Sequence, residues 1–248
     1  MLADYRSVPS TLASSVAKDR FPRRVAVLDG SFNPPTVCHG KMIVEAARAF
    51  GADAGLLLLS ATNADKPLSG ASVAERLCMM QAMRDDMLAG DGGVRCAIAA
   101  TDTPLFVDKA AMLREELGVL ARAVGGAAPP TVLLLLGADT VTRLFDVRFY
   151  GGAACARDGA LRRLFGKDGC VEIAVFDRPP SPNTSGVEDE TLVTLLASAA
   201  AAEHAAALLH ARGNLFASDH AQPAAHAAVA AAWAGRDPRR GVSATQAC

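Results

Sequence analysis

The sequence predicts an α/β protein with a Rossmann-like, doubly wound parallel sheet of five to six strands and helices on both faces. Short apolar runs of strand length alternate along the chain with segments of helical composition. The strand-like runs are apolar throughout, which is typical of parallel strands covered on both faces. Polar clusters follow several of these runs, at the edge where ligands of such sheets bind.

The expected elements follow one another in a regular order. A strand at 24–29 leads into a Gly/Asn/Pro cluster, which marks its end. Later strands are expected at 54–60, 94–100, 131–136 and 171–176, with a sixth at 214–218. Helices are expected at 40–50, 71–89, 107–123 and 197–211. The second helix carries one apolar face with Val73, Leu77, Met80 and either Met83 or Met87. Segments without a pattern are expected to be loops at 124–130, 151–169 and 179–190.

The length and net charge of the chain limit the number of domains and the kinds of partner that we expect. The 248 residues fit a single domain, with an N-terminal extension of about 1–23. A net charge of −1 gives no reason to expect a nucleic-acid or membrane partner, because either needs a local basic patch. The six cysteines lack metal-ligand spacing and are typical of a reducing compartment. We expect a cytoplasmic protein without a membrane span. A nuclear or organellar location stays open, as does assembly into a homo-oligomer.

The most informative segment follows the first strand, at residues 30–39, Gly-Ser-Phe-Asn-Pro-Pro-Thr-Val-Cys-His. Gly30 and Ser31 can present backbone N–H groups to an anion with little side chain in the way. Thr36 and His39 are three residues apart and can face one pocket at the start of the next helix. A histidine beside amides at a helix N-terminus is well placed to bind phosphate. A tight turn with an incidental histidine is the alternative for a shorter string of this kind.

The whole ten-residue string resembles the (H/T)xGH nucleotidyl transferases. Its first six residues resemble their nicotinamide/nicotinate mononucleotide adenylyltransferase branch. Thr36 occupies the first motif position, Cys38 the usual glycine and His39 the second histidine. The resemblance implies catalytic roles for His39 and Thr36. It also implies that the ATP-binding residues of this loop are Gly30, Ser31, Phe32 and His39.

The resemblance continues along most of the chain. Lys66 lies in a segment similar to the one that contacts the mononucleotide, and Arg76 lies where the family has an arginine-bearing helix. The resemblance assigns Gly137 and Asp139 to the ribose, and Arg178, Ser243 and Thr245 to the phosphates of ATP. The segments 106–109 and 139–150 are closest to a divergent, mainly fungal branch.

The chain departs from the family pattern at three places. Ala244 stands where the final motif has its second serine, and Cys248 stands where an arginine belongs. We therefore expect this motif, at 242–248, to be truncated. The segment 101–106 lacks the tryptophan on which the family stacks the nicotinamide ring. Phe106 is either its substitute or a core residue.

The resemblance implies an enzyme in which the 5′-phosphate of the mononucleotide attacks the α-phosphorus of ATP and pyrophosphate leaves. The nucleophile is already an anion, so catalysis reduces to positioning and to neutralising charge. Mg²⁺ is expected as the cofactor, held mainly by substrate phosphates and water. Two alternatives stay open: a related transferase with another acceptor, and a catalytically decayed nucleotide-binding protein.

Overall fold

The computed structural model describes residues 21–61, 69–89, 94–126, 128–165, 171–176 and 208–210. Six described strands form one sheet in the order β3-β2-β1-β4-β5-β6, with every neighbouring pair parallel. Their bounds are β1 (Arg24–Gly30), β2 (Ala54–Ser60), β3 (Cys96–Thr101), β4 (Thr131–Gly137), β5 (Val171–Phe176) and β6 (Leu208–His210). The strand order reverses between β1 and β4, which confirms the predicted Rossmann-like sheet.

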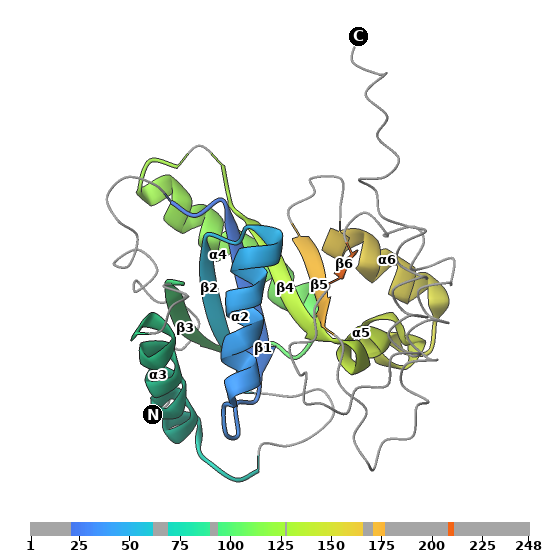
Figure 1. The fold of residues 1–248 in the computed structure, drawn as a ribbon. Helices are drawn as coiled ribbons and strands as arrows, with labels where there is room; N and C mark the ends of the chain where they lie inside the picture. Colours follow the sequence, from blue (N-terminus) through green and yellow to red (C-terminus); the bar gives the residue numbers. More distant parts are fainter. Residues whose placement is uncertain are drawn as a thin grey trace.

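Helices cover the sheet on both faces (Figure 1). The helices α2 (Val37–Phe50) and α3 (Val73–Ala89) pack on one face. The opposite face carries α4 (Phe106–Ala123), α5 (Ala138–Phe145) and α6 (Ala154–Phe165), with the 3-10 turn η1 (Val147–Tyr150) between the last two. None of the described helices is both long and apolar enough to cross a membrane.

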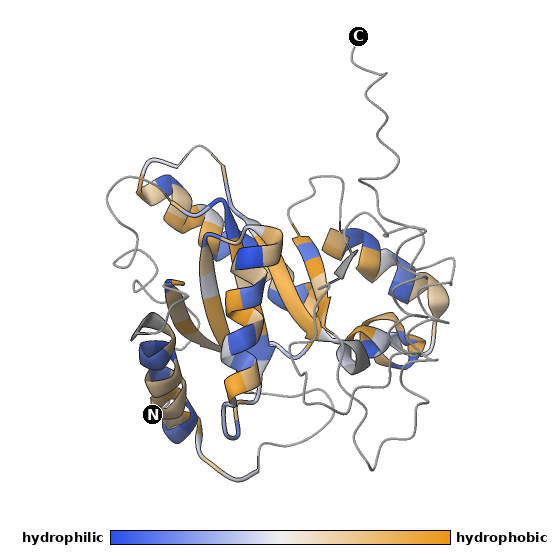
Figure 2. Ribbon diagram, viewed as in Figure 1, coloured by the Kyte–Doolittle hydropathy of each residue, from blue (hydrophilic) through white to orange (hydrophobic). Residues whose placement is uncertain are grey.

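Alternation along the strands divides the core into two layers. Val25 and Val27 of β1 lie in the cluster that includes α4 and α6, whereas Ala26 and Leu28 lie in the cluster that includes α2 and α3. The central strands are thus buried on both faces and almost uniformly hydrophobic, whereas the helices alternate between hydrophobic and hydrophilic residues (Figure 2). The predicted face of α3 is confirmed, with Met80 fully buried and its apolar neighbours packed around it.

Two local predictions are wrong. The segment 151–169, expected to be a loop, contains α6, whose buried face is Ala160, Leu161, Leu164 and Phe165. That face has helical spacing, but the glycines at 151, 152 and 159 obscure it in the sequence.

The second wrong prediction concerns the C-terminal end of the last expected helix, at 197–211. Residues 208–210, placed in that helix, form β6 and pair with β5 from Ile173↔Leu208 to Val175↔His210. Backbone pairing with a neighbouring strand overrides the helical preference of the alanine-rich surroundings. The sixth strand expected at 214–218 lies outside the described residues, as do 179–190 and the N-terminal extension up to residue 20.

Candidate active site

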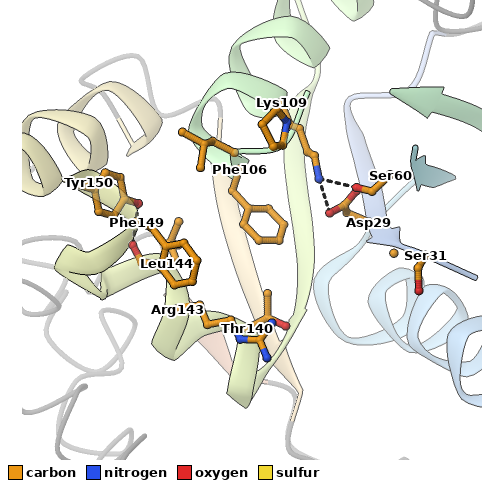
Figure 3. A pocket seen from close by; sticks show the side chains of 13 residues that line it. Asp29, Ser31, Ser60, Phe106, Lys109, Thr140, Arg143, Leu144, Phe149 and Tyr150 are labelled. Atoms are coloured by element: carbon orange, nitrogen blue, oxygen red, sulfur yellow. Dashed lines mark hydrogen bonds and ion pairs between the residues drawn. The ribbon is translucent and has the colours of Figure 1, made fainter. Parts of the chain in front are cut away.

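A pocket of about 180 Å³ lies at the carboxyl edge of the sheet, beside the reversal of strand order. Parallel β1 and β2 end next to each other there, with Gly30 opposite Leu59. The segment after β3, the first turn of α4, α5 and η1 complete the wall (Figure 3). The lining residues are Asp29, Gly30, Ser31, Ser60, Pro104, Leu105, Phe106, Lys109, Thr140, Arg143, Leu144, Phe149 and Tyr150.

A buried arginine in α3 holds the loop from β1 to α2 in place through hydrogen bonds. Arg76 of α3 is 1% exposed, and its guanidinium donates to the carbonyl oxygens of Ser31 at 2.8 Å, Ala71 at 2.7 Å and Ser69 at 2.5 Å. The Asn33 side chain donates to the same Ser69 carbonyl at 2.8 Å and accepts from the Ala71 N–H at 3.3 Å. A planar guanidinium with its donors in a fixed fork is suited to holding several carbonyls at once. The loop is thereby fixed to the segment that precedes α3.

Close packing also occurs at Gly70, in the segment that precedes α3, and at Phe32, in the loop itself. Gly70 has φ +81°, and a Cβ there would lie 2.6 Å from Nδ2 of Asn33, so only glycine fits. Phe32 has φ +42°, outside the usual regions for a side-chain-bearing residue, and its ring is buried. Its ring centroid lies 5.1 Å from that of His39.

The hydrogen bonds of His39 fix the state of its ring. Thr36 caps α2, and His39 is the third residue of that helix. Nδ1 of His39 accepts from the backbone N–H of Thr36 at 2.8 Å and lies 2.8 Å from the Thr36 hydroxyl oxygen. Because an amide N–H can only donate, Nδ1 carries no proton and the neutral ring holds its proton on Nε2. His39 therefore presents an N–H donor beside the first amides of α2.

A buried polar cluster forms where β1 and β2 end. Alternation places Asp29, like Val25 and Val27, on the α4 face of the sheet. The Lys109 ammonium donates to Oδ2 of Asp29 at 2.7 Å and to the Ser60 hydroxyl at 2.6 Å. The Ser60 hydroxyl donates to Oδ1 of Asp29 at 2.7 Å. Lys109 is 3% exposed, and its ammonium lies 5.1 Å from the ring centroid of Phe106.

The opposite wall of the pocket is aromatic. Tyr150 donates its hydroxyl to the Leu144 carbonyl at 2.7 Å, and burial raises the pKa of that phenol. It therefore stays a neutral donor at physiological pH. Phe106 packs against the core, as one of its two expected roles requires, and it also lines the pocket; its role as a substitute for the tryptophan stays a prediction.

The structure brings together a large part of the predicted site. Gly30 and Ser31, at the carboxyl end of β1, line the pocket, whereas Phe32, Thr36 and His39 follow in the loop and the first turn of α2 and are not among its lining residues. Gly137 ends the neighbouring strand β4, and Asp139 follows in the first turn of α5. The predicted residues that lie outside the described part of the chain are Lys66, Arg178, Ser243 and Thr245.

Six polar residues that line the pocket were not assigned a role from the sequence, namely Asp29, Ser60, Lys109, Thr140, Arg143 and Tyr150. A signal for two of them was available, since Asp29 and Ser60 are polar residues at the ends of otherwise apolar strands. Among the residues that the structure describes, no three His, Cys, Asp or Glu side chains are grouped to hold a metal ion.

The fold and this strand-end site resemble those of nucleotidyltransferases. A family model described as cytidylyltransferase-like matches residues 27–97, from β1 to the start of β3. A Schizosaccharomyces pombe protein, provisionally named a nicotinamide mononucleotide adenylyltransferase, is 32% identical over 185 residues. The match covers 75% of this chain and 66% of that relative. The chain thus spans slightly less than two thirds of the length of this relative, and it is similar to a nicotinamide mononucleotide adenylyltransferase, the family that its motifs resemble.

Solved structures of Plasmodium falciparum nicotinic acid mononucleotide adenylyltransferase are also similar. One is a complex with NaAD and the other a complex with APC. Each is 12% identical and covers 69% of this chain and 70% of its own, with TM-scores of 0.43 and 0.44.

Proposed function

We propose that this chain transfers the adenylyl group of ATP to nicotinamide or nicotinate mononucleotide, giving the dinucleotide and pyrophosphate. The observation that carries the proposal is the hydrogen bond from the Thr36 N–H to Nδ1 of His39, within a loop held by Arg76. It leaves an N–H donor of fixed orientation at the N-terminus of a helix, in the region of the sheet where nucleotides bind.

In the proposed reaction a phosphate oxygen of the mononucleotide attacks the α-phosphorus of ATP. The bond from that phosphorus to the bridging oxygen breaks, and pyrophosphate leaves with the electron pair. The attacking phosphate is already an anion, so no side chain has to remove a proton. We assign Nε2–H of His39 to the oxygens of the α- and β-phosphates, where negative charge builds in the transition state. The Gly30 and Ser31 amides and Thr36 support the same phosphates.

The acceptor is assigned to the pocket beside this loop. Phe106 and Phe149 give it apolar, aromatic walls that suit a planar pyridinium ring, and a cation is attracted to the face of such rings. Gly137 and Asp139, at the adjacent strand end, are assigned to ribose. Lys66, Arg178, Ser243 and Thr245 keep the roles predicted for them.

Mg²⁺ is assigned to the phosphates of ATP, where it would offset negative charge as the bond to the leaving group breaks. The residues at the described strand ends fit this arrangement. The Asp29 carboxylate there already accepts hydrogen bonds from Lys109 and Ser60, so it is not available as a ligand for Mg²⁺. The proposal therefore needs no ligand cage made by the protein.

One assay tests the proposed function. The chain is incubated with ATP, Mg²⁺ and either mononucleotide, and dinucleotide and pyrophosphate are quantified. Formation of both in equal amounts, lost in the His39→Ala variant, is the expected result. ATP binding without turnover would indicate a decayed site. Adenylyl transfer only to a different acceptor would indicate another member of the superfamily.

A further inference from the structure

Lys109 and Asp29 form an ion pair at the end of β1, and the burial of both charged groups there is unusual. The side chains of the lysine and the aspartate are 4% and 8% exposed. Removing two charges from water is costly, and a buried ion pair adds little stability compared with well-packed apolar residues. The neighbouring layer of the same face, with Val27 and Leu58, shows that apolar packing is available there. The pair therefore calls for a role other than stability.

The position of the Lys109–Asp29 pair indicates a role in binding, because both charged residues line the pocket (Figure 3). An ammonium has three N–H donors. Two of those of Lys109 are used by Asp29 and Ser60, and no other hydrogen-bond acceptor for it occurs among the residues that the structure describes. Phe106 lies at 5.1 Å from the ammonium, so a planar ring on Phe106 would bring its edge to Lys109.

The two mononucleotides of the proposed reaction differ in one group on the pyridine ring. Nicotinamide carries an uncharged carboxamide, and nicotinate carries a carboxylate at the same position. The remaining N–H of Lys109 can donate to an oxygen of either group, so the net charge beside it decides between them. The Asp29 carboxylate at 2.7 Å balances the charge of Lys109 and weakens its attraction for a second carboxylate.

We propose that Lys109 contacts the ring substituent of the acceptor and that Asp29, by neutralising Lys109, biases the pocket toward the uncharged carboxamide. Lys109 is then a specificity-determining residue, and Asp29 acts through it. The proposal rests on the proposed function, since it assumes that the pocket receives the acceptor. Arg143 is the other cation among the lining residues, so the test has to separate its effect from that of Lys109.

The experiment measures the dissociation constants of nicotinamide and nicotinate mononucleotide by titration calorimetry, on wild type and on Asp29→Asn. The substitution leaves the Lys109 charge unbalanced. We expect the ratio of the two constants to move toward nicotinate by about tenfold, the scale of one charged contact. Arg143→Met, which removes the other cation of the pocket lining, is the matched control. In this variant the ratio of the two constants should not move toward nicotinate. An unchanged ratio in folded Asp29→Asn, or no binding of either mononucleotide to wild type, overturns the proposal.

A second variant covers the case in which Asp29→Asn does not fold. The double variant Asp29→Asn/Lys109→Met buries no charge, and its circular dichroism and melting curve verify folding. It should bind both mononucleotides about tenfold more weakly, since it lacks the donor, without favouring nicotinate. Unchanged affinity for both would contradict the contact. These readouts do not depend on turnover, so a wild type that binds mononucleotide but forms no dinucleotide refutes the proposed function and leaves the binding ratio to decide this inference.

Discussion

The backbone N–H of Thr36 donates to Nδ1 of His39 at 2.8 Å, so one hydrogen bond sets which nitrogen of the histidine can donate to substrate. The bond ties the orientation of the ring to the start of α2. It also gives the threonine at the first motif position a role in orienting His39, beside the phosphate contact proposed for it. Its amide and its hydroxyl both lie at Nδ1.

The first prediction follows from this tautomer. His39→Ala should lower the rate of adenylyl transfer by roughly 10²-fold or more, because it removes a donor to charge that develops in the transition state. His39→Gln, whose amide can place an N–H near the Nε2 position, should retain more activity than His39→Asn, which reaches only the Nδ1 position. Steady-state rates of the three variants, with thermal melts to verify folding, check this order. Equal rates for wild type and His39→Ala would refute the role of the histidine.

The second prediction concerns the anchor of the phosphate loop. Arg76→Met should lower the free energy of unfolding by about 3 kcal/mol, because it strips three carbonyl oxygens of a buried charged donor. Arg84→Met, on the same helix, is the matched control. Arg84 pairs with Asp85, which is 64% exposed, and such surface pairs contribute roughly 0–1 kcal/mol. Denaturant unfolding of the two variants gives the comparison, and equal losses would contradict the anchoring role.

Much of the fold could be predicted because each central strand is buried on both faces and so appears as one apolar run. The bounds of β2 and β5 agree with the predicted ranges at both ends. The helix α6 was missed because glycines lie just before it and within its first half, and because its buried face consists of only four residues. The strand β6 was missed because its pairing with β5 is not encoded locally. Both errors concern segments whose structure depends on partners distant in sequence.

The candidate site divides in the same way. The loop from Gly30 to His39 is contiguous, so its motif could be identified from the sequence. Lys109 and Asp29 are 80 residues apart, and only the order of the strands and the packing of α4 bring them together. Period-two alternation places Asp29 and Ser60 on the same face as the apolar residues before them, but it does not reveal which helix covers that face.

The third prediction tests the close contact between β2 and α2. A Cβ on Gly55 would lie 2.8 Å from Cγ2 of Ile43 and 3.1 Å from Sγ of Cys96. Gly55→Ala should therefore destabilise the protein by about 1–3 kcal/mol through overpacking. Gly159→Ala in α6 is the control, since nothing lies within 4 Å of its added Cβ, and it should stabilise by about 0.5–1 kcal/mol. Thermal or denaturant unfolding measures both, and a neutral Gly55→Ala would show that the two layers can separate at no cost.

The fourth prediction uses the different surroundings of the cysteines. Burial of Cys96, the first residue of β3, in the core cluster on the face covered by α2 and α3 raises the pKa of its thiol to about 12, whereas Cys78 and Cys155 are exposed. Only the thiolate reacts with alkylating reagents, so Cys96 should stay unmodified at pH 8 and at pH 9.5 while the two exposed cysteines are modified. Limited treatment with iodoacetamide, followed by mass spectrometry of the peptides, gives the extent at each position. In denaturant the burial is lost and all three should react at similar rates. Modification of Cys96 in the native protein as fast as Cys78 would mean that the layer between α2 and the sheet opens readily, and it would also weaken the case for a phosphate loop held rigidly at the start of that helix.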